Sequence, residues 1–402
     1  AYLGLSAFTI FFNRLCGRSP GGADVLMRYT LRLLTAQQFQ RASLLFCAME
    51  YLRKQPDWRD KLGDDPFRLG MWVGGDATPN RRSQARTALG NLQRNPDSEN
   101  PFILLKCPWC NARFGPDRVS GGGGMRGRGR GGGLRPRQHV YGYSLLRKPG
   151  SVDTVVFRCD DPDCEFGRHP VNPKPPLPIV IIDEDIYEFP PNLVIGTVDK
   201  FAMLAWRPDT RAIFGLGKDG RHVGFPPSLI IQDELHLISG PLGSMVGAYE
   251  TMIEELCIQR DGGKLVRPKI VASTATISRA EEQVKDLYAR ERVMLFPPSG
   301  LETSDSFFAR EDRNRDGTSK PGRKYIGIMT PGHGSLQTTE ARVFATLLQY
   351  PAIMPIEDGD ETERDPWWTL LCFFNSLREL GGAATLLVSD ARDYLRILLN
   401  RH

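Results

Sequence analysis

An acidic cluster made of Asp233, Glu234 and His236 directly follows an apolar run, Leu229 to Ile231. Such a run predicts a buried strand, and residues after a parallel strand face the ligand-binding edge of an open α/β sheet. At that edge, Asp233 is expected to hold Mg²⁺, and Glu234 to orient and deprotonate the water that attacks a γ-phosphate. His236 would sense the nucleotide. The alternative is an acidic strand end that only caps the next helix.

A second apolar strand is predicted within Pro268–Ile277, and it ends in the hydroxyl residues Thr274 and Thr276. We expect it to lie in the same sheet, with both hydroxyls bonding the acidic cluster and relaying nucleotide state. Asp-Glu-x-His followed by Thr-Ala-Thr resembles motifs II and III of superfamily 2 (DExH-type) helicases. The resemblance implies that ATP and Mg²⁺ are cofactors.

Further strand-turn segments carry residues that match the nucleic-acid contacts of these helicases. They are Thr30 and Arg32 (motif Ia), Gly74 and Gly75 (the GG element), Thr197 and Lys200 (motif Ib), and Asn375 and Ser376 (motif IV). The resemblance implies that these residues contact nucleic-acid phosphates, as helix N-termini, hydroxyls and basic side chains do. Taken alone, the motif Ia segment would be better interpreted as an ordinary βα unit, and the glycine pair is a weak signal.

The alternation of strands, turns and helices predicts an α/β fold, a RecA-like parallel sheet with helices on both faces. An insertion interrupts it, and an apolar stretch from Trp367 is expected to be a strand that starts a second RecA-like domain. The predicted divisions are 1–100 with 170–300 for the first RecA-like domain, 101–169 for the insertion, 301–365 for a connecting segment and 366–402 for the second RecA-like domain.

The insertion carries two close cysteine pairs, Cys107 with Cys110 and Cys159 with Cys164. C-x₂-C and C-x₄-C spacings in turn-rich loops are typical of structural zinc sites, in which four protein ligands leave no position open for chemistry. We therefore predict a structural Zn²⁺. The alternatives are four unconnected thiols, or a mixed site that uses His139 or His169.

Gly121–Arg137, between the two cysteine pairs, is rich in glycine and arginine and lacks the means to bury a core. Its arginines could track a phosphate backbone, or the segment could be only a solvated loop.

The chain has 402 residues and a formal net charge of +5, which permits a polyanionic partner without requiring one. No apolar run approaches the length of a membrane span and no signal peptide is evident, so no membrane partner is expected and a cytoplasmic location is predicted. The helix predicted over Ala1–Leu15 resembles the one that follows the phosphate-binding loop in helicases. We expect that loop upstream of Ala1 and motifs V and VI beyond His402, so this chain alone should be inactive.

Three segments resemble the helicase subunits of bacterial DISARM anti-phage systems: Arg28–Gln38, Gln232–Ser244 and Phe373–Leu380. This resemblance implies DNA as substrate, a DrmB-like protein partner and a defence role. The predicted function is an ATP-dependent helicase or translocase, because a scaffold has no need of the hydrolytic Glu234. The alternatives are an ATP-independent DNA-binding scaffold that keeps the helicase fold, or a DNA-repair or RNA helicase with a zinc insertion.

Overall fold

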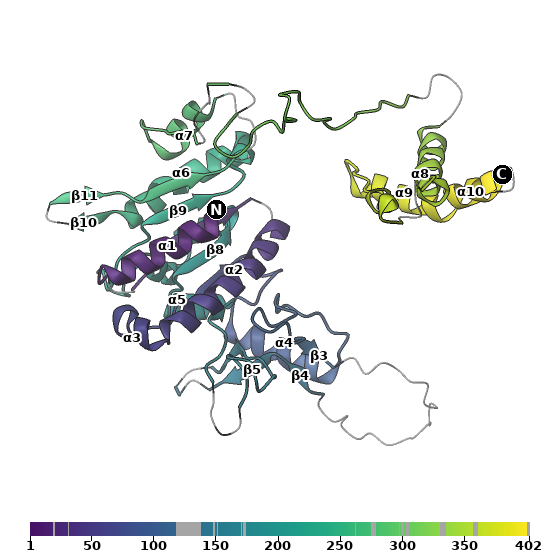
Figure 1. Cartoon of the computed structure of the whole chain (residues 1–402). Helices are drawn as coiled ribbons and strands as arrows, with labels where there is room; N and C mark the ends of the chain where they lie inside the picture. Colours follow the sequence, from purple (N-terminus) through teal and green to yellow (C-terminus); the bar gives the residue numbers. More distant parts are fainter. Residues whose placement is uncertain are drawn as a thin grey trace, which may run out of the picture. The chain divides into compact units, whose positions relative to one another are not determined.

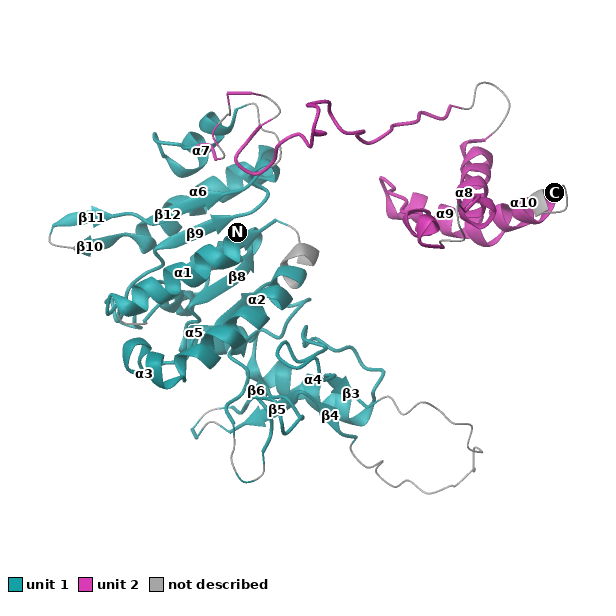
Figure 2. Ribbon diagram, viewed as in Figure 1, with its two compact units in different colours: residues 1–294 teal, residues 295–402 magenta. Residues whose placement is uncertain are grey.

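The computed structural model forms two compact units, Ala1–Met294 and Leu295–His402 (Figure 2). Each is described separately here. The residues described are 1–18, 21–30, 32–117, 138–147, 149–150, 152–169, 171, 174–261, 263–274, 279–296, 298, 301–302, 305–329, 335–356 and 361–399, with the side chains of 32–36, 261 and 398–399 set aside.

The first unit is organised around a six-stranded sheet with the order β12-β9-β1-β8-β2-β7. Every pairing in this sheet is parallel. The strands are β1 (Val25–Tyr29), β2 (Leu69–Trp72), β7 (Ile179–Val180), β8 (Leu193–Thr197), β9 (Leu229–Gln232) and β12 (Lys269–Ala272). All except the short edge strand β7 lie within stretches expected to contain strands.

Alternate residues of the central strands enter two different cores. Val25 and Met27 of β1 belong to a core on one face of the sheet, whereas Leu26 belongs to a core on the other. Successive side chains of a strand point to opposite faces, so a strand covered on both sides must be apolar throughout. This explains why β1, β8 and β9 appear in the sequence as continuous apolar runs.

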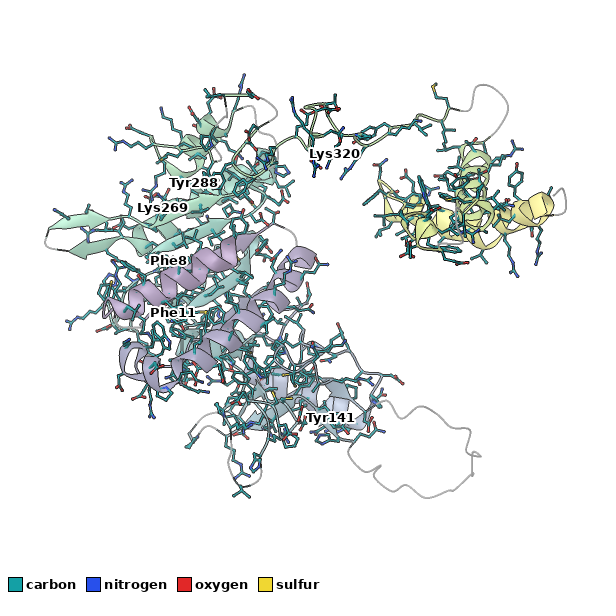
Figure 3. All side chains as sticks on the ribbon, in the orientation of Figure 1. Phe8, Phe11, Tyr141, Lys269, Tyr288 and Lys320 are labelled. Atoms are coloured by element: carbon teal, nitrogen blue, oxygen red, sulfur yellow. The ribbon has the colours of Figure 1, made fainter. Side chains whose placement is uncertain are left out.

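Helices cover both faces of the sheet (Figure 1). One face carries α1 (Tyr2–Leu15) and α2 (Arg32–Arg53), with α3 (Pro56–Leu62) beside them; the other carries α5 (Asp183–Glu188), the 3-10 helices η1 (Val198–Ala205) and η2 (Pro208–Phe214), and α6 (Gly240–Cys257). On α1, Phe11 packs edge-on against Phe67 with ring centroids 5.2 Å apart, while Phe8 is exposed (Figure 3). The expected α/β fold with a helix-flanked parallel sheet is confirmed.

Two smaller elements extend the sheet domain beyond α6. A hairpin joins β10 (Gln259–Asp261) to β11 (Lys264–Val266), and α7 (Ala280–Tyr288) packs on α6. No strands were predicted from the sequence for this hairpin. No helix in the described part of the chain is long and apolar enough to cross a membrane.

The cysteine insertion is built on α4 (Arg82–Arg94) and two small antiparallel pairs. β3 (Gly115–Pro116) pairs with β4 (Val140–Tyr141), and β5 (Tyr143–Leu146) pairs with β6 (Thr154–Phe157). Gly142 joins β4 to β5 at φ 82°, and a Cβ there would clash with the Phe114 ring, so the tight join requires glycine. The Gly121–Arg137 segment lies outside the described residues.

The second unit contains α8 (Leu336–Ile353), the 3-10 helix η4 (Glu361–Trp367), α9 (Leu377–Val388) and α10 (Asp390–Leu399). The three α-helices pack around Phe344, Ala383 and Ala391. The strand expected from Trp367 is wrong: no strand forms there, and Phe373 is exposed. A strand needs a paired neighbour, and the described part of this unit offers none. A second RecA-like domain is therefore not seen here.

Candidate nucleotide site and metal centre

The acidic cluster is locked between β1 and β12 at the carboxyl ends of the strands. The Asp233 N–H donates to the Arg28 carbonyl of β1 at 2.9 Å, and the Leu235 N–H donates to the Ser273 carbonyl just after β12 at 2.9 Å. The Ser273 N–H in turn donates to Gln232 at 2.9 Å. Both neighbouring strands thus fix the backbone on which the two acids are carried.

Ser273 is the hydroxyl residue that bonds Asp233: its Oγ donates to Asp233 Oδ1. Sequence reasoning named Thr274 and Thr276 as the residues that bond the acidic cluster. Thr274 does contact the cluster, but at His236, with its Oγ1 3.4 Å from His236 Nδ1; Thr276 lies outside the described residues. The missed signal was register: β9 and β12 pair Gln232 with Ala272, so the next residues, Asp233 and Ser273, are level.

Glu234 has a left-handed backbone conformation, with φ 52° and ψ 49°, which is uncommon for a residue other than glycine. This turn brings its Oε2 to 3.4 Å from His236 Nδ1, and its side chain stays 34% exposed. Strained backbone of this kind persists where the surroundings impose it, and it occurs often at functional sites. The carboxylate of Glu234 is therefore held by the fold yet accessible to water.

Two tyrosines that sequence reasoning missed lie close to the acids. Burial raises the pKa of the Tyr2 phenol most; Ser273 acts against this shift, and the Asp233 and Glu234 carboxylates add to it. Burial and then Asp233 raise the pKa of Tyr29. Because Tyr2 is the first residue of α1, the amino end of that helix lies at the acidic edge of the sheet.

The expected nucleic-acid residues of motifs Ia and Ib and of the GG element gather at the same carboxyl edge. Thr30 follows β1, Gly74 and Gly75 follow β2, and Thr197 ends β8. A Cβ at Gly75 would lie 2.9 Å from the Asn80 amide nitrogen, so this turn is packed closely. The structure thus places these four residues on one side of the sheet.

The hydroxyl groups of that set are enclosed. Thr30 Oγ1 and Thr197 Oγ1 are buried without a hydrogen-bond partner in the described part of the chain. Thr197 is fully buried, so its hydroxyl does not reach the surface in this conformation. Arg32 begins α2, and its side chain is outside the described set.

Lys200 differs from its expected role. Its ammonium is buried 2.8 Å from Asp183 Oδ2 and 3.3 Å from Asn80 Oδ1. Burial raises the pKa of Asp183, and Lys200 opposes that rise. A buried ammonium must stay paired because its desolvation is costly. In this structure the side chain joins η1 to α5 and is not available to a phosphate.

Asn375 and Ser376 lie in the helical unit and not at a sheet edge. Ser376 is the N-cap of α9, and its Oγ accepts the Glu379 N–H at 3.2 Å. The Asn375 N–H donates to the Glu379 carboxylate at 3.0 Å. These contacts satisfy the free N–H groups of a helix start, so the residues have a capping role here.

The cysteines converge as predicted. The sulfur atoms of Cys107, Cys110, Cys159 and Cys164 all lie within 4.8 Å of one another. Cys107 Sγ is 3.8 Å from Cys164 Sγ, and Cys110 Sγ is 3.5 Å from Cys159 Sγ. Sulfurs at about 2.3 Å from a tetrahedral ion are roughly 3.8 Å apart, so this cluster could hold a metal ion. Neither His139 nor His169 belongs to the group.

Tight turns present the four sulfurs. Asn111 takes φ 63°, and its N–H donates to the Cys107 carbonyl at 2.9 Å. A Cβ at Gly167 would clash with the Asp161 carbonyl. Burial, with the neighbouring thiols adding to it, raises the pKa of Cys164 to about 12. Four thiolates would repel one another here, so a bound cation fits the cluster's chemistry.

No protein-family model matches the chain. A curated protein, DISARM protein DrmA of Bacillus paralicheniformis, is 35% identical to it over 439 aligned positions that cover 100% of the chain. The chain resembles DrmA. It spans 36% of the length of that protein. The expected resemblance to DrmA is confirmed, the superfamily 2 class is consistent with it, and the similarity extends over both compact units.

Proposed function

We propose that this chain is part of a DrmA-like superfamily 2 helicase or translocase that couples ATP hydrolysis to movement on DNA. Its similarity to a DISARM protein supports a role in bacterial anti-phage defence. A DrmB-like protein partner and a cytoplasmic location are part of the same proposal. The sheet unit would be the first RecA-like domain. The proposal rests on one observation, the two acids at one edge of the sheet. Asp233 is bonded by Ser273, whereas Glu234 has a left-handed backbone conformation.

The two acids have environments suited to different tasks. Asp233 has one oxygen bonded by Ser273, which leaves Oδ2 for Mg²⁺ or its bound water. Glu234 is turned outward with its carboxylate near His236, where it can orient and deprotonate an attacking water. Mg²⁺, when bound beside Asp233, would neutralise part of the negative charge of the phosphates. A binding scaffold would need Asp233 and Glu234 for neither task.

The start of α1 supports a phosphate position beside these acids. The helix has 14 residues and begins at Tyr2. Free N–H groups and the helix dipole at such an end favour anions. Since Tyr2 lies near Asp233 and Glu234, a nucleotide phosphate at this end would be within reach of a metal held by Asp233.

We further propose that the cysteine cluster holds a structural Zn²⁺. Zinc favours four sulfur ligands in a tetrahedron, and a closed site of this kind stabilises a fold without catalysing a reaction. The insertion buries Phe102, Tyr143 and Phe157 against one another, in a core that it shares with one face of the sheet. The metal would hold its loops together.

The test of the motor function is Glu234→Gln in the full-length protein. ATP hydrolysis at saturating DNA should fall by about a hundredfold or more, because a positioned base commonly contributes that much, while Mg²⁺-ATP binding is retained. Glu255→Gln, an exposed glutamate of α6, is the matched control and should keep full turnover. Near-normal turnover in Glu234→Gln would remove Glu234 from the mechanism.

If the protein is not an ATP-driven motor, the alternative function is an ATP-independent DNA-binding scaffold. In that case the full-length protein would bind DNA with the same affinity in the presence and absence of Mg²⁺-ATP. It would also show no hydrolysis above that of Glu234→Gln. These two results together would reject the proposal.

A further inference from the structure

The cysteine insertion contains a pocket of about 660 Å³ that neither the nucleotide site nor the metal cluster uses. Its walls come from α4, from β4 to β6 and from the segment after Cys164. The lining residues are Leu89, Gln93, Gln138, His139, Val140, Tyr143, Ser144, Leu145, Leu146, Val156, Arg158, Arg168 and His169. None of them is acidic, although two are arginines.

The cationic side of the pocket is only partly neutralised, by one carboxylate. Arg168 Nε is 3.4 Å from Asp160 Oδ1, and His139 Nε2 is 3.6 Å from the same oxygen. Asp160 also accepts the Gly142 N–H at 2.5 Å, so a single carboxylate serves several donors. In the described part of the chain, no carboxylate lies within ion-pair distance of Arg158. Burial, and then the positive charge of Arg168, lower the pKa of Arg158.

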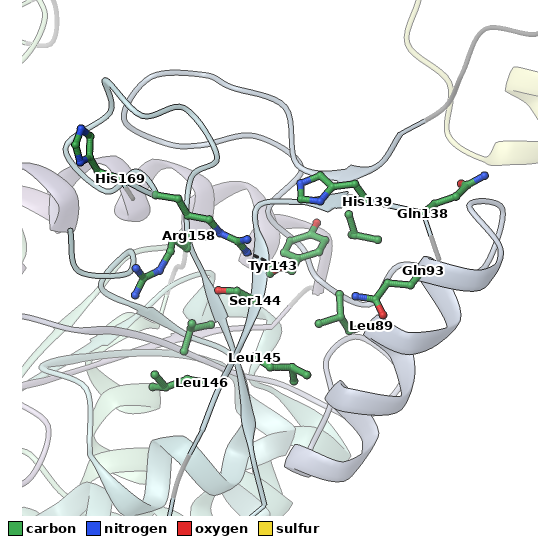
Figure 4. Close-up of a pocket in the computed structure, with 13 residues that line it drawn as sticks. Leu89, Gln93, Gln138, His139, Tyr143, Ser144, Leu145, Leu146, Arg158 and His169 are labelled. Atoms are coloured by element: carbon green, nitrogen blue, oxygen red, sulfur yellow. Dashed lines mark hydrogen bonds between the residues drawn. The ribbon is translucent and has the colours of Figure 1, made fainter. Parts of the chain in front are cut away.

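The opposite side of the pocket is apolar and open. Leu145 and Leu146 are 47% and 42% exposed, and Leu89 of α4 faces the same space. Figure 4 shows Arg158 and His139 on one rim, with Leu145 and Leu146 below them. A ligand that fills this pocket must therefore be anionic at one end and flat or apolar at the other.

We propose that this pocket binds one nucleotide of a single-stranded nucleic acid, with its phosphate against Arg158 and Arg168. The base would lie against Leu89 and Leu145, beside the exposed imidazole of His139, which is a planar side chain. Arginine forks match phosphate geometry, and bases stack readily on planar side chains without regard to sequence. The glutamine amides of Gln93 and Gln138 would give the base polar contacts.

A volume of this size suits such a ligand, because small-molecule pockets are commonly about 300–1,000 Å³. The inference rests on the proposed nucleic-acid function, and it adds a contact on the insertion that is separate from the edge of the sheet. An acidic protein segment would satisfy the arginines equally well. It would have less use for a flat apolar wall beside an imidazole.

The test uses the full-length protein and a fluorescent oligothymidylate at several salt concentrations. Arg158→Glu should weaken binding on the order of tenfold or more, since a hydrogen bond to a charged group is lost and a like charge is added. Arg158→Ala should make the salt dependence shallower by about 0.7 per lost phosphate contact. Arg113→Ala, an exposed arginine of the insertion outside the pocket, is the matched control and should change neither quantity.

Metal content is measured for every variant, so that a collapsed insertion is recognised. Unchanged affinity and salt slope in Arg158→Glu with metal retained would overturn the pocket proposal. Polyglutamate that binds the unchanged protein, and loses binding in Arg158→Glu while the oligonucleotide does not, would assign the pocket to acidic protein instead. ATP hydrolysis in Glu234→Gln is a separate measurement, so either proposal can fail while the other stands.

A second arm keeps the proposal testable if Arg158→Glu misfolds. An oligonucleotide with photoreactive thymidine analogues should crosslink to peptides that contain His139 or Leu145–Leu146. Crosslinks confined to the sheet unit's carboxyl edge, with none in the insertion, would contradict the proposal.

Discussion

Arg28 of β1 and Glu250 of α6 form a buried, bidentate ion pair, with an Nη1–Oε2 distance of 2.6 Å and an Nη2–Oε1 distance of 3.2 Å. The two side chains are 0% and 2% exposed. Burial alone lowers the pKa of Arg28, but Glu250 more than offsets this and the pKa is raised. Because the Arg28 carbonyl also accepts the Asp233 N–H, the pair links α6 to the backbone of the acidic cluster.

Removing one member of this pair should be costly. Glu250→Ala would leave a buried guanidinium without its counter-ion, and breaking such a pair costs about 3–5 kcal/mol of unfolding free energy. Urea unfolding followed by circular dichroism measures the loss. Glu255→Ala breaks an exposed pair with Arg260 and should cost about 0–1 kcal/mol. Equal stabilities for the two variants would show that the buried pair does not hold the fold.

Ser273 is predicted to position Asp233 for the metal. Ser273→Ala removes a hydrogen bond to a carboxylate, which is worth about 1.5–3 kcal/mol, so half-maximal ATP hydrolysis should need roughly ten- to hundredfold more Mg²⁺. Ser273→Thr keeps the hydroxyl and should restore most of the Mg²⁺ affinity. The measurement is a Mg²⁺ titration of turnover in the full-length protein. An unchanged Mg²⁺ requirement in Ser273→Ala would mean that Asp233 needs no such support.

The metal cluster predicts one equivalent of zinc per chain. Elemental analysis should show its loss in Cys107→Ser and Cys164→Ser, because three thiolates hold zinc less tightly than four. Proteolysis should then increase within 106–168, while the parallel sheet and the helices that cover it stay folded. Cys16→Ser is the matched control, since Cys16 is exposed and outside the cluster. Full zinc retention in both cluster variants would refute a site made of these four cysteines.

Buried tyrosines predict a loss of stability in alkali. Burial raises the pKa of Tyr143 to about 12, against an ordinary value of about 10. Because the folded pKa is the higher one, this contribution to stability is complete below pH 10 and is lost as the pH rises toward 12. Burial also raises the pKa of Tyr187 and Tyr249. When the pH is raised, the phenolate absorbance of the folded protein should increase at a higher pH than that of the urea-unfolded chain. Identical titration curves for the two states would contradict the prediction.

Much of the sheet was predictable because its strands are short, apolar and bounded by turn residues. β9 and β12 form within the expected stretches and pair directly, and this pairing brings Asp233 beside Ser273. The sequence alone could not show which hydroxyl residue bonds Asp233, because that depends on the register between β9 and β12. Thr274 and Ser273 are neighbours in sequence, yet Ser273 contacts Asp233 whereas Thr274 contacts His236.

Other features depended on partners distant in sequence. Glu250 as the partner of Arg28 has no local signal, since 222 positions separate the two residues. The apolar stretch from Trp367 resembled a strand in composition, but composition does not supply a paired neighbour. The cysteine cluster was easier to predict, because the spacing within each pair already limits the geometry.

For Lys200, the sequence motif and the structure predict different roles. If Lys200 contacted a phosphate, Lys200→Ala would make the salt dependence of DNA binding shallower by about one unit and leave stability unchanged. Its buried pairing with Asp183 predicts the reverse. Lys200→Ala would leave a buried carboxylate unpaired, so unfolding free energy should fall by about 3–5 kcal/mol. The salt slope of the folded protein should stay the same.

The double variant Lys200→Met with Asp183→Leu separates the two roles. Replacing both members of a buried pair by apolar residues is often neutral or stabilising, so the double variant should recover most of the stability lost in Lys200→Ala. Its DNA affinity, measured by titration at several salt concentrations, should match that of the unchanged protein. Restored stability with a shallower salt slope would mean that Lys200 leaves Asp183 and contacts a phosphate when DNA binds. The sequence-based role would then hold for the bound state.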